Sequence, residues 1–164
     1  MGLTRAHTRI ALGQAAADLA DHAIAVVTDV AEDVIARDRI RAARSLRLDA
    51  IRAVDLAVLV ARADGESWDD LAGHLGYTHS GMDPDEHTAA VDAVRRTYEP
   101  VYDLWSAGPA PGAPVTEHDP GTLADTDLPG TAASLDSWVI RHTAGWAELP
   151  ERAVSRVLDT SNHE

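Results

Sequence analysis

Three histidines and three carboxylates lie close together in the middle of the chain, where they could supply nitrogen and oxygen ligands to a metal ion. These residues are His74, His79 and His87, with Asp83, Asp85 and Glu86. Their spacing matches neither a His-Glu-x-x-His motif nor an acidic calcium loop. We therefore expect a solvated loop with incidental histidines, no metal site and no bound cofactor.

Other catalytic patterns are missing from the sequence. It has no glycine-rich phosphate loop and no Gly-x-Ser-x-Gly nucleophile motif. Cysteine is absent, which excludes disulfides, zinc–thiolate sites and cysteine nucleophiles. Serine, histidine and aspartate all occur, but without geometry their presence carries no information about catalysis. The sequence therefore predicts no catalytic residues, and an enzyme is the less favoured class.

Arginine provides the clearest chemical pattern. All 14 basic residues are arginine, in a chain whose formal net charge is −13. Between residues 37 and 62 there are seven arginines and only three aspartates, so this segment is locally cationic. At about 100° per residue, five of these arginines would share one side of a helix or lie next to it. They are Arg37, Arg41, Arg44, Arg47 and Arg52.

These five arginines, with Arg95 and Arg96 further along the chain, are the residues that we expect to contact a partner. Such a cluster could bind phosphate, RNA or the acidic face of a protein. The alternative is internal pairing, because the chain holds 27 Asp and Glu residues. Since the net negative charge repels bulk DNA, a protein is the expected partner.

The elements that carry these residues are predicted to be helices. The composition is 45% hydrophobic without any Phe, and its many Ala and Leu residues favour helix. No stretch alternates apolar and polar residues over the length of a strand. We therefore expect an all-α multi-helix bundle. A helical body should cover residues 1–106, a Pro/Gly-rich loop or linker 107–131, and C-terminal helices packed on the body 132–164.

Helices are expected over residues 4–36, 38–63, 67–75, 84–105, 132–149 and 151–158. In the first, apolar residues follow a heptad spacing. They are Leu12, Ala16, Leu19, Ala23, Val26 and Val30. This seam either packs the helix on its neighbours or forms a homodimer through Leu12, Leu19, Val26 and Val30.

Apolar residues also follow a helical period in the second and fourth segments. A stripe of Ile51, Val54, Val58 and Ala61, widened by Leu56, Leu59 and Val60, predicts that this end of the second helix is buried on most sides. In the fourth, Val91, Val94, Tyr98, Val101 and Trp105 recur at helical spacing. Pro100 should kink or break that helix near Tyr98.

Local signals define the ends of the two central helices. Ser67 can cap a helix, and Asp70 three residues later can complete a capping box. Gly65 and Gly76 are placed to end helices in the left-handed conformation. Asp83, followed by Pro84 and Glu86, is a second capping signal.

The segment around the first cap matches a known pattern. Its residues are Gly65, Ser67, Trp68, Leu71, Ala72, Leu75, Gly76 and Thr78. This string resembles helix-turn-helix proteins of actinobacteria, over about residues 48–98. The resemblance implies a tri-helical element in which small Ala72 lets two helices approach and the helix after the turn enters the DNA major groove.

The part that should read DNA departs from this pattern. Base readout uses Arg, Lys, Asn or Gln side chains. The segment from Thr78 to His87 instead contains Gly81, Pro84 and three carboxylates. The recognition segment is therefore degenerate, and we expect a regulatory or accessory binding protein that acts mainly through protein contacts. A sequence-specific DNA-binding regulator is the first alternative.

Tryptophans suggest a second alternative. Trp105, Trp138 and Trp146, with His142, could line an apolar pocket between the 84–105 helix and the C-terminal helix. A small-molecule-binding or catalytic helical protein would use such a site. Because no basic region precedes an apolar run and no uninterrupted apolar segment reaches about 18 residues, we expect no membrane partner and a cytoplasmic location.

Overall fold

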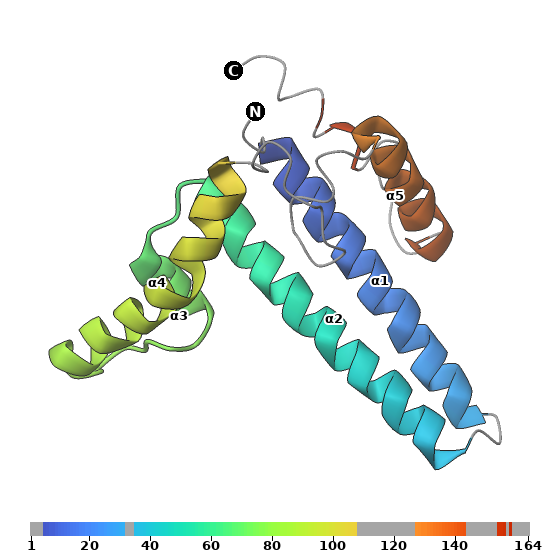
Figure 1. The fold of residues 1–164 in the computed structure, drawn as a ribbon, viewed down its shortest axis with the longest axis horizontal. Coiled ribbons are helices and arrows are strands. Elements are labelled where there is room, and N and C mark those ends of the chain that lie inside the picture. The colour runs from blue at the N-terminus through green and yellow to red at the C-terminus, as the bar shows by residue number, and fades with distance from the viewer. Residues whose placement is uncertain (1–4, 32–34, 108–126, 144–153, 157, 159–164) are drawn as a thin grey trace.

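The computed structural model describes residues 5–31, 35–107, 127–143, 154–156 and 158. Five helices account for nearly all of them, and the described residues form no strand, which confirms the all-α class. The helices are α1 (Arg5–Ala31), α2 (Ala36–Ala63), α3 (Trp68–His74), α4 (Pro84–Ala107) and α5 (Leu128–Thr143). Figure 1 shows α1 and α2 as a long antiparallel pair. Helix α5 packs against α1, whereas α3 and α4 pack near the C-terminal end of α2 (Figure 1).

Helix α1 is central because it packs against α2 on one side and α5 on the other. Ala11 and Ala15 join Leu56 and Leu59 of α2 in one apolar cluster. A second cluster on α1 contains Ile10 and Ala17, which pack against Ala132 and Leu135 of α5. Small alanine side chains allow close approach of the helices on both sides.

The single heptad seam predicted along α1 is therefore wrong in part. Ala16 is exposed, while Ile10 and Ala17, which lie outside the seam, are buried. Leu12 packs beside the cluster shared with α2. A helix with two neighbours buries two stripes of residues, and one coiled-coil seam does not describe it.

By length and composition, α1 is also the one described helix that could cross a membrane, although the sequence was expected to contain no membrane span.

Helices α2, α3 and α4 share a third apolar cluster. Its buried members are Val58 of α2, Leu71 and Ala72 of α3, and Val94 of α4. Ala72 is fully buried, as expected for a small residue at a close helix contact. Both predicted glycine turns are confirmed, with φ of 98° at Gly65 and 77° at Gly76.

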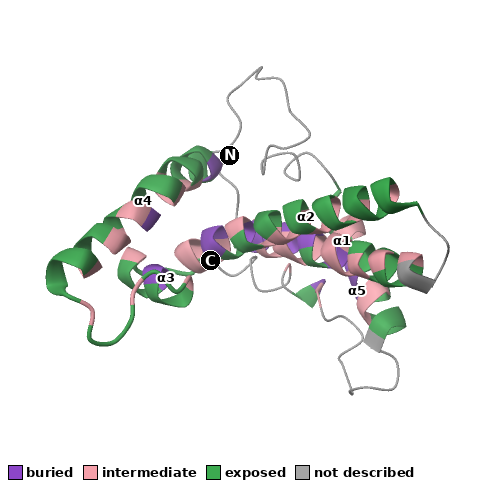
Figure 2. Ribbon diagram, turned by 90° about the horizontal axis from the view of Figure 1, so that it is seen from below, coloured by how far each residue is buried: buried purple, intermediate pink, exposed green. Residues whose placement is uncertain are grey.

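The stripe predicted along α2 is buried only at its C-terminal end. Leu56, Val58 and Leu59 are buried, but Ile51 and Val54 are each 46% exposed. Helices α3 and α4 reach only the last turns of α2, so apolar residues before this contact lie open to solvent (Figure 2).

Two helix boundaries differ from the sequence-based expectation. Helix α4 continues through Pro100 to Ala107, so the break near Tyr98 does not occur; packing of Tyr98 and Trp105 holds both sides of the proline in place. Helix α5 begins at Leu128 and not at residue 132, because Asp127 caps it by accepting a hydrogen bond from the Gly130 amide at 3.0 Å.

The remainder of the predicted loop, residues 108–126, lies outside the described residues, as do residues 144–153. Buried Asp136 of α5 accepts hydrogen bonds from the backbone amides of Val154 and Ser155. This carboxylate fixes the short C-terminal turn against α5.

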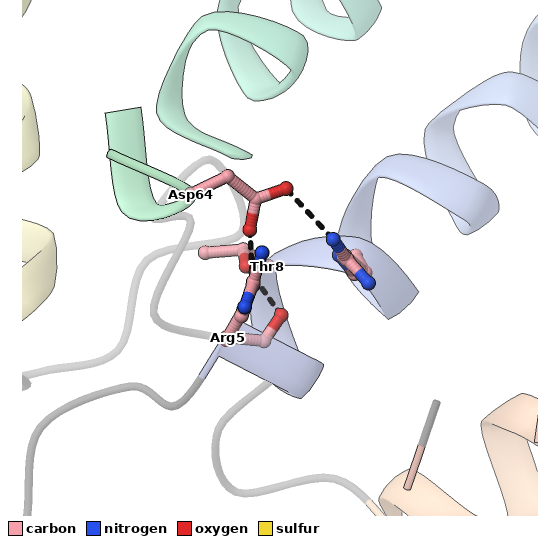
Figure 3. A network of polar contacts seen from close by, with 4 residues as sticks. Arg5, Thr8 and Asp64 are labelled. Carbon is pink, nitrogen blue, oxygen red and sulfur yellow. Dashed lines mark hydrogen bonds and ion pairs between the residues drawn. The ribbon is translucent and has the colours of Figure 1, made fainter. Parts of the chain in front are cut away.

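A carboxylate also ties the start of α1 to the end of α2. Asp64 is in contact with the Arg5 guanidinium and accepts a hydrogen bond from Arg9 at 2.7 Å, while Thr8 donates to the Arg5 carbonyl (Figure 3). Partial burial alone would raise the pKa of Asp64, but the hydrogen bonds and charges of Arg9 and Arg5 outweigh it and lower that pKa. Asp64 therefore links the N-terminal end of α1 to the C-terminal end of α2, where α3 and α4 also pack.

Replacing Ser67 by alanine is expected to destabilise the α3 region by about 0.5–2 kcal/mol. The Ser67 hydroxyl accepts from the Asp70 amide at 3.1 Å, and the Asp70 carboxylate accepts from the Ser67 amide, as the predicted capping box requires. Urea unfolding followed by circular dichroism measures the loss. Ser67→Thr retains the hydroxyl and should lose less; equal losses in both variants would contradict the capping role.

Candidate functional site

The five arginines predicted from helical spacing line the N-terminal two thirds of α2, and we call them the cationic α2 face. All five are exposed, as the sequence pattern required: Arg37, Arg41, Arg44, Arg47 and Arg52. This part of α2 packs on α1 and extends away from α3 and α4, so its outer side faces solvent (Figures 1 and 2).

Internal pairing accounts for only the first two of these arginines. Asp38 lies 3.2 Å from the Arg41 guanidinium and 3.9 Å from that of Arg37. Arg44, Arg47 and Arg52 form no ion pair with any carboxylate in the described ranges. Among the described residues, therefore, internal pairing reaches Arg37 and Arg41 but not these three.

Exposed apolar side chains lie among Arg44, Arg47 and Arg52. Leu48 is 55% exposed and Ile51 is 46% exposed, although the sequence placed Ile51 in a buried stripe. Both residues line a groove of about 630 Å³ formed by α1, α2 and α4. The walls also include His22, Ser45, Asp49, Arg52, Asp55, Leu56, Leu59 and Val101. The sequence did not reveal this groove, because its walls come from three separate helices.

The two carboxylates of the groove already have partners. His22 Nδ1 on α1 lies 2.5 Å from Asp49 Oδ2 on α2. The Tyr98 hydroxyl on α4 donates to Asp55 Oδ1 at 3.1 Å. Burial, together with the charge of Asp55 and this hydrogen bond, raises the pKa of Tyr98 to about 12, so the phenol stays protonated and keeps donating. These contacts orient Asp49 and Asp55 within the protein, whereas Arg52 forms no ion pair with a described residue.

The other two predicted arginines are separate from the cationic α2 face. Arg95 on α4 pairs with Glu99 at 2.9 Å, and hydrogen bonding to Glu99 raises its pKa. Arg96 is exposed. Val94, which precedes Arg95 on α4, belongs to the same apolar cluster as Val58 of α2. Val58 lies about 21 Å from Arg44 along the axis of α2. The seven predicted arginines therefore fall into two separate groups.

The segment that would face DNA in a helix-turn-helix is acidic at its surface. Helix α4 begins with exposed Pro84, Asp85 and Glu86, and Asp83 caps it by accepting from the Asp85 amide at 2.9 Å. The helix that follows the α3 turn therefore presents carboxylates where phosphates would approach.

The histidines of this region lie in separate pairs. His74 Nε2 is 3.3 Å from Glu66, and His87 Nε2 is 3.1 Å from Asp69. His79 is exposed. Within the described part of the chain, no three potential ligands converge on one point.

The structure does not assemble the predicted tryptophan pocket. Trp105 packs with residues of α1 and α2. Trp138 belongs to the α5 cluster, donates to Asp21 at 3.0 Å and stacks on His142 with ring centroids 4.1 Å apart. Helix α1 lies between α5 and α2, so the two tryptophans occupy different cores, and Trp146 lies outside the described residues (Figure 1).

Comparison with known proteins adds no assignment: no family model, no curated protein and no solved structure matches the chain. The cationic α2 face and the adjoining groove form the candidate site. Together they combine guanidinium groups that have no ion-pair partner among the described residues, exposed aliphatic side chains and a recess at one junction of three helices.

Proposed function

We propose that this chain is a regulatory or accessory binding protein that acts through protein contacts on the cationic α2 face. One observation carries the proposal: Arg44, Arg47 and Arg52 are exposed without a carboxylate partner in the described structure, although the chain as a whole carries a net charge of −13. Although the chain is rich in acids, none of the described ones pairs with these arginines. Their guanidinium groups can therefore bind carboxylates of a partner.

The residue type and its surroundings support a protein partner. Guanidinium groups bind carboxylates through two parallel hydrogen bonds and are enriched at interface hot spots. Leu48 and Ile51 add exposed apolar surface beside them, and apolar anchors surrounded by polar residues are typical of protein interfaces. Phosphate backbones would leave this apolar surface unused.

A sequence-specific DNA-binding regulator is the alternative, supported by the packing of α3 and α4 on α2 in the order of a helix-turn-helix. The carboxylates at the start of α4 count against it, since they would repel phosphates. A gel-shift assay at low salt with the DNA upstream of the protein's own gene tests this alternative. A sequence-dependent shift at micromolar protein would favour it over protein binding.

Reversing Arg44 and Arg47 to glutamate is expected to reduce recovery of the partner at least tenfold, because each new carboxylate repels an acidic surface that the arginine attracted. The melting temperature should change little, since both side chains are exposed and form no ion pair with a described residue. The measurement is quantitative mass spectrometry of proteins that copurify with the tagged full-length chain from its native cells, followed by reconstitution with the purified candidate.

Arg141→Glu with Arg156→Glu provides a matched control, because it makes the same change in net charge at exposed positions away from α2. This control should retain the partner. Equal recovery with the α2 variant and the wild type would contradict the proposal. A large fall in melting temperature on reversing Arg44 and Arg47 would instead show that these arginines are paired internally.

A further inference from the structure

We infer that the partner element bound by the cationic α2 face is an amphipathic helix, with carboxylates on one side and large aliphatic residues at i, i+3, i+4 and i+7. The inference deepens the proposed function and rests on it. It is carried by the way in which charge and apolar surface alternate along α2 beside the groove.

The residues of this surface share one side of α2 and alternate in character. At about 100° per residue, Arg44, Leu48 and Ile51 lie within a narrow arc, and Arg52 lies at its margin. Arg47 lies at the opposite margin. Leu48 thus lies one turn after Arg44 and one turn before Arg52, whereas Ile51 is one turn after Arg47 and is followed one turn later by Asp55. A helix lying along this face would place aliphatic residues over Leu48 and Ile51 and carboxylates over the arginines.

The charges of the surface favour an acidic occupant. Arg44, Arg47 and Arg52 have no ion-pair partner among the described side chains. Two carboxylates line the groove: Asp49 contacts His22, and Asp55 accepts from the Tyr98 hydroxyl, which is neutral and leaves the charge of Asp55 in place. The carboxylates of an incoming helix would therefore lie over Arg44 and Arg47, at the end of the surface away from Asp55.

The groove provides the recess that aliphatic anchors need. Its volume of about 630 Å³ lies within the ordinary range for binding sites, and Leu56, Leu59 and Val101 supply apolar walls. Its walls come from α1, α2 and α4. An added helix could pack against them at the usual helix–helix separation of about 8–10 Å.

Two other occupants fit the surface less well. A nucleic acid would match the arginines but would gain nothing from Leu48 and Ile51. An anionic membrane would match both, yet the net charge of −13 would repel it as the body of the protein approached. Duplex DNA and anionic vesicles therefore serve as competing probes in the test.

The test measures fluorescence anisotropy of a labelled synthetic peptide of about 18 residues, long enough to form a helix. The peptide carries Leu at i, i+3, i+4 and i+7 and Glu at most other positions; a second peptide carries Lys in place of Glu. Both are titrated with the full-length chain, and a labelled DNA duplex and phosphatidylserine-containing vesicles are titrated in parallel.

The Glu/Leu peptide is expected to bind at least tenfold more tightly than the Lys/Leu peptide. Its affinity should fall as salt is added. Arg44→Glu with Arg47→Glu, and separately Leu48→Ser with Ile51→Ser, should each weaken binding by about tenfold or more. Leu48 and Ile51 are exposed, so their replacement should leave the melting temperature unchanged. The Arg141→Glu, Arg156→Glu control should bind like the wild type.

Binding that is insensitive to Leu48→Ser with Ile51→Ser would overturn the inference, as would tighter binding to the duplex or to the vesicles. Failure of this inference differs from failure of the proposed function. If a cellular partner is lost on reversing Arg44 and Arg47 while the Glu/Leu peptide does not bind, the protein contact stands and the amphipathic helix is wrong.

Discussion

Replacing Trp105 by alanine is expected to lower the free energy of unfolding by about 3–5 kcal/mol. Trp105 is only 4% exposed and is the largest member of the cluster in which α4 meets Leu56 and Leu59 of α2 and Ala11 of α1. Its removal would leave a cavity where three helices meet. Urea unfolding followed by circular dichroism measures the loss.

Trp105→Phe is the matched variant, since it keeps an aromatic ring at the same place. The indole Nε1 is buried and donates no hydrogen bond to a described residue, so losing the N–H group removes no such bond. The loss of unfolding free energy in Trp105→Phe should therefore be less than half of the loss in Trp105→Ala. A loss of less than about 1 kcal/mol on Trp105→Ala would show that α4 does not depend on this contact.

Ile10→Ala is expected to destabilise the protein by about 2–5 kcal/mol, chiefly by releasing α5 from α1. Ile10 is fully buried and packs against Ala132 and Leu135 of α5. Among the described helices, α5 makes most of its contacts with α1. The backbone amides of α5 should therefore exchange hydrogen faster in this variant than in the wild type, and the increase should be larger in α5 than in α2. Hydrogen–deuterium exchange with mass spectrometry resolves α5 from α2.

Ile24→Ala is the control, because it removes the same atoms from an exposed position of α1. Ile24 lies on the same helix but is 50% exposed, so the same deletion should cost far less and leave exchange in α5 unchanged. Equal destabilisation at positions 10 and 24 would contradict the cluster, and so would faster exchange in α2 than in α5 after Ile10→Ala.

Local structure could be predicted closely because its causes lie within a few residues of each other. The Ser67 and Asp70 box, the Asp83 cap and the left-handed Gly65 and Gly76 all occur as expected. The caps depend on a side chain that meets backbone groups two or three positions away, and the two glycines adopt the left-handed conformation because they lack a Cβ. The start of α5 was placed four residues late because Pro129 and Gly130 suggested a loop, although proline is tolerated in a first helical turn.

Burial was predicted less well on the two longest helices, α1 and α2. The single seam on α1 and the long stripe on α2 failed at Ala16, Ile51 and Val54. Helical periodicity shows which residues share a side, but not how much of that side another helix covers. Trp105 and Trp138 also share an apolar character, yet α1 lies between their clusters and keeps them apart.

The sequence by itself determined the helices, their caps and the cationic side of α2, because residue type and spacing along one helix suffice for these properties. Only the tertiary structure decided that Asp49 contacts His22 of α1 and that Asp55 accepts a hydrogen bond from Tyr98 of α4. The tertiary structure also formed the groove, whose walls come from α1, α2 and α4. These pairings and the groove depend on contacts between residues far apart in the chain, and a linear pattern does not contain those contacts.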